Sequence, residues 1–330
     1  MIRRIIWTLG TLVILLGLNL ALPRILNPYL FQILILCGIN VILAVSLNLI
    51  NGFTGQFSIG HAGFMAIGAY GSAMLSLHAG IGWVAALTAA GVPPGVAEGA
   101  ALFAALLAGG LLSALAGYLV GLPSLRLRGD YLAIVTLGFG EIIRVLILNI
   151  DAVGAARGLP GIPGWVSFFW VGLGVTGVVV LALNLARSSH GRALFAIRDD
   201  EIAAESLGVN TTAYKVLAFV IGAFFAGVAG GLFAHYLSYL NPNSFTFIKS
   251  IEVIAMVVLG GMGSVSGSVL AAILLTLLPE VLRPVKDYRM VIYSLMLIVL
   301  MITRPQGLLG SREIRLGSWV GKLRVARGAG

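Results

Sequence analysis

A first group of polar residues that could act in chemistry or docking lies in residues 187–210. The rest of the sequence is mostly apolar. Asp199, Asp200 and Glu201 precede a short apolar run within residues 187–210, and acids at the start of a helix are favoured by its dipole. Gly208 is typical of a helix end. We predict two short helices joined near the two aspartates. Such a protrusion suits docking into a groove of a soluble partner; an amphipathic loop lying on a membrane is the alternative.

A second group of candidates lies in two Gly- and Ser-rich segments, residues 51–70 and 259–268. In both, an apolar stretch leads into glycines and serines and then into another apolar stretch. Paired interruptions of this kind indicate an internal repeat and a substrate path, since non-helical backbone in a membrane must be covered by protein or line a cavity. Tight helix packing through small residues is the alternative.

The third candidate is a pair of opposite charges, Glu141 and Arg144, within an apolar run. Three residues apart, they share one face of a helix. A charge at bilayer depth costs about 2.5–3.5 kcal/mol on insertion scales. We expect the two to pair against the bundle interior, or to line a cavity or subunit interface. Glu252 is expected near the outer end of its helix, with its charge reaching the interface.

The sequence contains no motif for ATP binding, metal binding or nucleophilic catalysis. The chain has no G-x-x-x-x-G-K-[ST] sequence to cradle ATP phosphates. Its four histidines, at 61, 78, 190 and 235, lack metal-ligand spacing, and no serine, histidine and aspartate set is evident. We expect a protein that is not an enzyme and binds no metal or cofactor.

The elements that position these residues follow from composition. Of the 330 residues, 59% are hydrophobic and 10% charged, against about 25% charged in soluble domains, and the mean hydropathy is +1.04. This excludes a soluble enzyme and a disordered chain. The single cysteine, Cys37, excludes a disulfide scaffold. What fits is an all-α integral membrane protein forming one domain over 1–330.

Ten apolar stretches are long enough to be predicted as membrane spans. They cover residues 5–22, 30–50, 57–78, 100–121, 131–149, 165–186, 213–238, 250–262, 266–282 and 289–303. The stretch 80–98 holds two prolines and a glutamate, so we expect an interfacial connection there. The first span is predicted to be a retained signal anchor, because no small-x-small cleavage site precedes Pro23.

Orientation follows from how Lys and Arg are distributed along a chain whose net charge is +9. Of the 21 Lys and Arg residues, 14 fall in the N-terminus, 122–130, 187–215 and the tail 304–330. Positive residues favour the cytoplasm, so both termini and the 187–212 loop are predicted to be cytoplasmic. The same excess suits anionic lipid better than nucleic acid. The basic, Gly-rich tail is expected to be a mobile, surface-associated end.

Several motifs together resemble one family. Residues 47–70 resemble the N-terminal motif of branched-chain amino acid ABC permeases, and 125–144 resemble the LivM-type subunit in particular. Residues 192–210 are similar to the family's cytoplasmic coupling loop, and 259–267 and 303–308 to its late motifs. The likeness runs from about Leu47 to Leu309. One departure is Ile202, where the general coupling motif has glutamate.

The resemblance implies about ten transmembrane helices in the permease fold of the vitamin B12 and ribose importers. It implies a bacterial inner-membrane importer with a second related permease, two ATPases that hold ATP and Mg²⁺, and an extracytoplasmic solute-binding protein. ATPase-coupling residues are then Arg192, Arg198, Asp199, Asp200, Glu201, Ala203, Ala204, Leu207 and Gly208.

The substrate is expected to pass beside the Gly-rich segments at the interface with the second permease. Candidates for the path are Gly52, Gly55, Gln56, Ser58, Gly60, His61, Thr136, Glu141, Gly260, Gly261, Gly263, Ser264 and Ser266. Uptake of branched-chain amino acids is the expected function. A urea or short-amide permease of the same superfamily and an ion-coupled secondary transporter are the alternatives.

Overall fold

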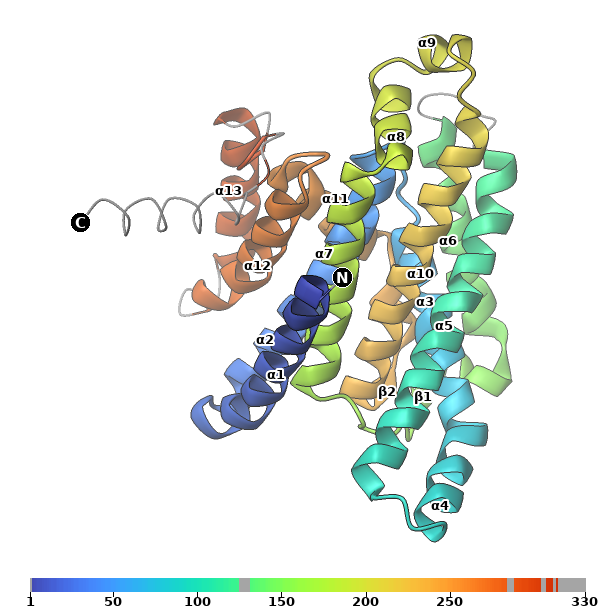
Figure 1. The fold of residues 1–330 in the computed structure, drawn as a ribbon, viewed down its shortest axis with the longest axis vertical. Helices are drawn as coiled ribbons and strands as arrows, with labels where there is room; N and C mark the ends of the chain where they lie inside the picture. The colour runs from blue at the N-terminus through green and yellow to red at the C-terminus, as the bar shows by residue number, and fades with distance from the viewer. Residues whose placement is uncertain (1, 125–130, 284–287, 304–306, 311–312, 314–330) are drawn as a thin grey trace, which may run out of the picture.

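The computed structural model describes residues 2–124, 131–283, 288–303, 307–310 and 313. Figure 1 shows a bundle of helices with a small protrusion at one end and a helical turn-back at the other. The helices are α1 (Ile2–Ile25), α2 (Pro28–Asn51), α3 (His61–Leu75), α4 (Ile81–Ala89), α5 (Pro94–Ser124), α6 (Tyr131–Asn149), α7 (Phe168–Arg187), α8 (Ser189–Asp199), α9 (Glu201–Ser206), α10 (Thr211–Leu237), α11 (Phe247–Gly260), α12 (Val265–Val281) and α13 (Arg289–Thr303).

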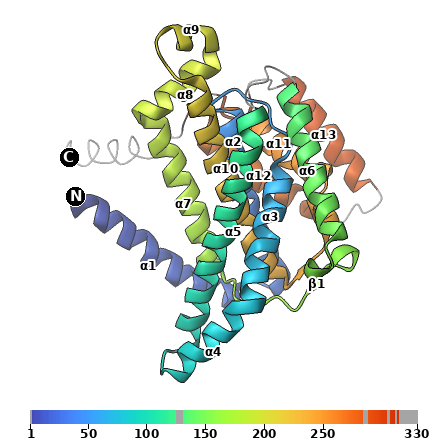
Figure 2. The same cartoon turned by 90° about the vertical axis from the view of Figure 1, so that its right-hand side faces the viewer.

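Helix α2 forms the centre of the bundle. Its second half is buried without interruption from Val41 to Asn51, and it packs against α7, α10, α11 and α12. A helix that is apolar all round is expected to be enclosed by others. The N-terminal α1 lies outside this core against α7 and leans away from the bundle (Figure 2).

Small residues bring α3, α5 and α10 into close contact. A methyl group on Gly68 of α3 would lie 2.1 Å from the Cα of Gly227 in α10. On Gly109 of α5 it would lie 2.5 Å from the carbonyl oxygen of Gly68. Small residues at helix interfaces allow such close approach in membrane proteins. These glycines therefore act in packing, which was the alternative considered for the Gly-rich spans.

The stretch 80–98 differs from the predicted connection. A π-helical turn, Ser76–Gly80, joins α3 to α4 without a break, and α5 begins at Pro94. Only the turn around Gly91, which has a φ of 89°, is non-helical. Helix α4 is apolar and exposed and extends α3 at the far end of the bundle in Figure 1. The stretch therefore adds no separate crossing of the bundle.

The end of the bundle away from α8 and α9 carries irregular structure between α6 and α7 and after α10. It includes 3₁₀ turns at 151–153, 155–157 and 242–245. Strands β1 (Leu159–Pro160) and β2 (Tyr239–Leu240) pair antiparallel, with Leu159 opposite Leu240. This pairing ties the two connections together beneath the bundle (Figure 1).

Each of the ten predicted spans coincides with a helix, but their lengths differ. In the described chain, six helical stretches are long and apolar enough to cross a membrane: 28–51, 61–89, 94–123, 131–149, 168–187 and 211–237. The third begins at residue 61 and not at 57, because the Gly-rich segment before it is not helical. Helix α11 has 14 residues, about 21 Å at 1.5 Å per residue, which is short of the roughly 30 Å hydrocarbon core.

The described residues of the tail, 307–310 and 313, pack against the bundle. The expectation of a mobile end is therefore wrong for these residues. Leu308 N donates to Leu259 O at 2.7 Å, and Gly307 is buried. Glu313 accepts from Val265 N at 2.5 Å and from the Ser266 hydroxyl at 2.6 Å, so it caps α12. The basic residues of the tail and those of the 122–130 segment lie outside the described residues.

Candidate functional site

The first Gly-rich segment is a compact non-helical turn between α2 and α3. Asn51 closes it, since its side-chain oxygen accepts from Ser58 N at 3.2 Å and its amide donates to Ser58 O at 3.4 Å. Thr54 donates back to Ile50 O at 2.6 Å. These bonds end α2 and satisfy backbone groups that a helix would otherwise pair, as buried polar groups require. We call residues 52–60 the first break.

The second Gly-rich segment, residues 261–264 between α11 and α12, lies directly against the first. Asn48 of α2 joins them: its Oδ1 accepts from Gly263 N at 2.8 Å, and its Nδ2 donates to Ser264 O at 3.1 Å. A methyl group on Gly52 would lie 2.3 Å from Gly263 N, so glycine alone permits this approach. We call residues 261–264 the second break.

Helix α8 contacts both breaks through Arg198. Its Nη1 donates to Gly52 O at 3.3 Å, and a methyl group on Gly263 would lie 2.8 Å from the same nitrogen. Asp199 accepts from Nη2 at 3.0 Å, and the guanidinium lies 5.1 Å from the centre of the Phe195 ring. Arg198 is therefore fixed on three sides where the two breaks meet.

An aromatic contact completes the junction. The rings of Phe53, in the first break, and Phe195, in α8, have centroids 4.9 Å apart. Leu194 and Ile197 on α8 are buried, so its apolar face packs into this chain. Displacement of α8 would therefore displace the first break with it.

The two predicted helices of the 187–212 loop are present and are joined at Asp200. The Asp200 carboxylate accepts from Ile202 N at 2.9 Å and Ala203 N at 3.0 Å and so caps α9. Gly208 has a φ of 83° and ends that helix, while Val209 N donates back to Ala204 O at 3.1 Å. The expected helix stop is confirmed.

The acids of this loop make contacts within the chain, while Asp199 and Asp200 also stay exposed. Glu201 accepts from Lys215 Nζ at 2.6 Å, and Lys215 is 6% exposed. Glu205 accepts from the Thr211 hydroxyl at 2.7 Å. The tip also exposes two large apolar side chains, Ile202 at 65% and Leu207 at 85%, while Ala204 is buried. Arg192 and Ala203 are also exposed.

The end of the first break connects to α6 and α11. Ile59 N donates to the Thr136 hydroxyl at 3.0 Å, and Ala62 N donates to the Ser250 hydroxyl at 3.0 Å. The Ser46 hydroxyl donates to Leu43 O at 3.0 Å. Its 2.9 Å contact with His61 Nε2 therefore has the imidazole as donor. The predicted Thr136 and His61 thus lie in one hydrogen-bonded region with the break.

Most predicted path residues are buried inside this chain: Gly52, Gln56, Ser58, Gly60, His61, Thr136, Gly260, Gly261 and Ser264. Gly55 is exposed, and Glu141, Gly263 and Ser266 are half-buried. Three atoms of the first group, Gln56 Oε1, Ser58 Oγ and His61 Nδ1, have no hydrogen-bond partner in the described structure. These three atoms can form further hydrogen bonds in and beside the first break.

The Glu141–Arg144 pair forms as predicted, with 2.8 Å between Arg144 Nε and Glu141 Oε2. It does not lie in the interior, because the side chains remain 37% and 25% exposed, respectively. Helix α6 is at the edge of the bundle (Figure 2), so its polar face is not enclosed by the described chain. Glu252 accepts from Lys249 Nζ at 3.1 Å, and its side chain is 45% exposed.

Five residues that make these contacts were not among the predicted site residues: Asn48, Phe53, Lys215, Lys249 and Glu313. Asn48 had a local signal, because it stands with Asn51 on one helix face just before the glycines. Glu313 had none, since its partners in α12 lie almost fifty residues earlier.

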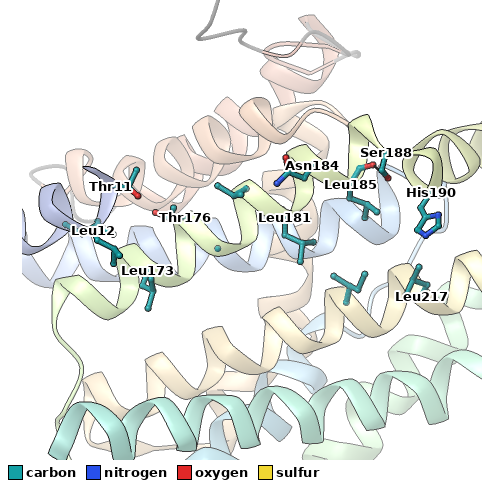
Figure 3. A pocket seen from close by; sticks show the side chains of 14 residues that line it. Thr11, Leu12, Leu173, Thr176, Leu181, Asn184, Leu185, Ser188, His190 and Leu217 are labelled. Carbon is teal, nitrogen blue, oxygen red and sulfur yellow. Dashed lines mark hydrogen bonds between the residues drawn. The ribbon is translucent and has the colours of Figure 1, made fainter. Parts of the chain in front are cut away.

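A groove of about 900 Å³ runs between α1, α7 and α10. Figure 3 shows that its wall is mainly apolar, with Asn184, Ser188 and His190 gathered toward α8. Within the described residues, no predicted path residue lines it. The groove is therefore separate from the junction of the two breaks.

A multi-pass bundle whose interrupted helices meet beneath a two-helix protrusion has the organisation of a membrane transport permease. The chain belongs to the family described as branched-chain amino acid transport system, permease component, whose model matches residues 29–302.

Individual relatives agree with this family. The chain is 40% identical to the high-affinity branched-chain amino acid transport system permease protein LivM of Escherichia coli K12, over 90% of this chain and 74% of that protein. It is 26% identical to a probable branched-chain amino acid transport permease protein LivM of Methanocaldococcus jannaschii, over 86% and 94%. The permease protein LivH of Escherichia coli K12 is 33% identical over 45% and 48%. No solved structure matches the chain.

Proposed function

We propose that this chain is a permease subunit of an ATP-binding-cassette importer for branched-chain amino acids in the bacterial cytoplasmic membrane. It assembles with a second related permease, two ATP-binding subunits and an extracytoplasmic solute-binding protein. ATP and Mg²⁺ bind to the partner ATPases, and this chain carries no catalytic residue. The ten helices form a permease fold of the vitamin B12 and ribose importer type, with both termini cytoplasmic.

The observation that carries the proposal is the contact of Arg198 with the two breaks. Helices α8 and α9 protrude from one end of the bundle (Figure 1), with Ile202 and Leu207 free to enter a groove on an ATPase. A push on this tip is transmitted through α8 to the point where α2, α3, α11 and α12 are interrupted. The junction then alternates between two arrangements as ATP binds and leaves the partner subunits.

The substrate passes beside these breaks. Backbone groups and the unpartnered atoms of Gln56, Ser58 and His61 offer a polar route for a zwitterion, which needs hydrogen-bonding groups without a fixed net charge. The relatives are named as branched-chain amino acid permeases, which supports these substrates over urea or short amides. The structured α8–α9 element supports an ATPase-driven importer over an ion-coupled transporter.

The test is reconstitution of the chain with its second permease, ATPases and binding protein in lipid vesicles. We expect uptake of radiolabelled leucine that requires ATP and the binding protein. A parallel assay with urea is the control for the alternative substrate class. Uptake driven by an ion gradient without ATP, or of urea in preference to leucine, would contradict the proposal.

A further inference from the structure

Helix α11 carries an ion pair that neither the breaks nor the α8–α9 element uses. Lys249 Nζ donates to Glu252 Oε2 at 3.1 Å and to Asn40 Oδ1 at 3.2 Å. Asn40 Nδ2 donates in turn to the Thr276 hydroxyl at 2.9 Å. Side chains from α11, α2 and α12 thus form one connected set, which we call the Lys249–Glu252 network.

The network lies deep along the bundle. Asn40 is the thirteenth of the 24 residues of α2, about 18 Å from either end at 1.5 Å per residue. A hydrocarbon core is roughly 30 Å thick, so Asn40 and the Lys249 ammonium beside it stand near its middle. Lys249 therefore belongs to a helix within the bundle and not to a connecting loop.

The network is also open to one side. The side chains of Lys249 and Glu252 are 23% and 45% exposed, and their neighbours Ile248 and Ile251 are exposed as well. Ionisable groups at membrane depth face a bundle interior or a water-filled cavity and not lipid. The described residues of this chain leave this face of α11 uncovered, so it fits the wall of an aqueous path.

We propose that Lys249 and Glu252 bind the charged head of a permeating α-amino acid, an inference that rests on the proposed function and gives it a site. The Glu252 carboxylate accepts hydrogen bonds from the substrate ammonium, and the Lys249 ammonium donates to the substrate carboxylate. Ile248 and Ile251 offer an apolar surface to the substrate side chain. Lys249 stays hydrogen-bonded to Asn40 while Glu252 exchanges Lys249 for the substrate ammonium.

The charge balance favours a zwitterion over other ligands. The internal pair is exchanged for two pairs with the substrate, and the net charge of the site stays at zero throughout. Because Lys249 and Glu252 satisfy each other when the site is empty, they compete with the substrate. Binding is then weak enough for release, as a transport path requires.

The test uses the complete transporter in vesicles, with wild-type leucine uptake as an arm that examines the proposed function alone. The double variant Lys249→Met/Glu252→Gln removes both charges without leaving either unpaired, a change that a purely structural ion pair often tolerates. We expect at least tenfold slower leucine uptake, with unchanged subunit co-purification and unchanged ATP hydrolysis stimulated by the binding protein. The control is Glu280→Gln/Arg283→Gln, at the end of α12 where both residues contact Tyr29, with uptake as in the wild type.

A second measurement tests whether water reaches the site. In a Cys37→Ala background, Glu252→Cys should react with a cationic, membrane-impermeant thiol reagent, because the proposed site is open to water. Failure of wild-type uptake contradicts the proposed function. Given wild-type uptake, normal transport by the double variant overturns the assignment of Lys249 and Glu252, as does loss of subunit assembly, which marks an interface, or an unreactive cysteine.

Discussion

Arg198 Nη1 donates to the carbonyl oxygen of Gly52 at 3.3 Å, across 146 residues of sequence. The donor stands on α8, outside the long helices, and the acceptor begins the first break, where α2 ends. The same guanidinium stands beside Gly263 in the second break. One side chain thus connects the protruding element with both interruptions of the bundle.

Arg198→Ala should separate ATP hydrolysis from transport. The variant loses the hydrogen bond to Gly52 and the contact with Phe195, while α8 keeps its buried Leu194 and Ile197. We expect the complex to assemble and hydrolyse ATP while leucine uptake falls about tenfold or more. Arg198→Lys restores the charge but not the planar group and should recover only part. Equal uptake by wild type and Arg198→Ala would show that the contact transmits nothing.

Gly208→Val should weaken attachment of the ATPase while the permease still inserts. Nothing lies within 4 Å of a Cβ placed at Gly208, so the penalty is the positive φ of 83°, about 1–3 kcal/mol for a strained residue. Gly208→Ala should be milder, because β-branched residues fit this conformation worst. Co-purification of the ATPase with each variant is the measurement.

The apolar tip gives a matched control for that result. Ala203→Asp/Leu207→Asp places two charges on exposed positions of α9 without backbone strain. If this variant and Gly208→Val both keep the ATPase bound and coupled, the tip is only a solvated connection.

Asn48→Leu should destabilise the junction of the breaks. The change leaves Gly263 N and Ser264 O without the partners they now have, and a buried unpaired group costs about 1–3 kcal/mol. We expect a lower thermal transition of the purified permease and slower uptake. Asn40→Leu, in the same helix but away from the breaks, should lower uptake through the Lys249–Glu252 network and leave the thermal transition closer to that of the wild type. Identical transitions for Asn48→Leu and wild type would contradict the bridging role.

The orientation predicts opposite labelling at the two ends of the bundle. Ser189 and Ala156 are both exposed, and in Figure 1 the α8 end and the β1 end lie far apart. Single cysteines at these positions, in a Cys37→Ala background, should react from the cytoplasmic and outer sides respectively. Reaction of the Ser189→Cys variant in intact cells with an impermeant reagent would reverse the topology.

The sequence by itself determined the features that depend on neighbours in the chain. Apolar length indicated a helix at each of the ten predicted spans but not at α4. The acids and Gly208 marked the two short helices, and the spacing of Glu141 and Arg144 predicted their pair. These inferences rest on helix periodicity and capping, which act over three to five residues.

Only the tertiary structure decided what those elements meet. Asn48 binds a break more than two hundred residues away, Lys249 reaches Asn40, and Glu201 turns inward to Lys215. Glycines that the sequence could assign equally to a path or to packing allow close approach of the backbone at Gly52 and at Gly68. The physical reason is that close packing selects partners by shape and by the need to pair every buried polar group. The spacing of residues along the chain predicts neither the shapes that meet nor the groups that pair.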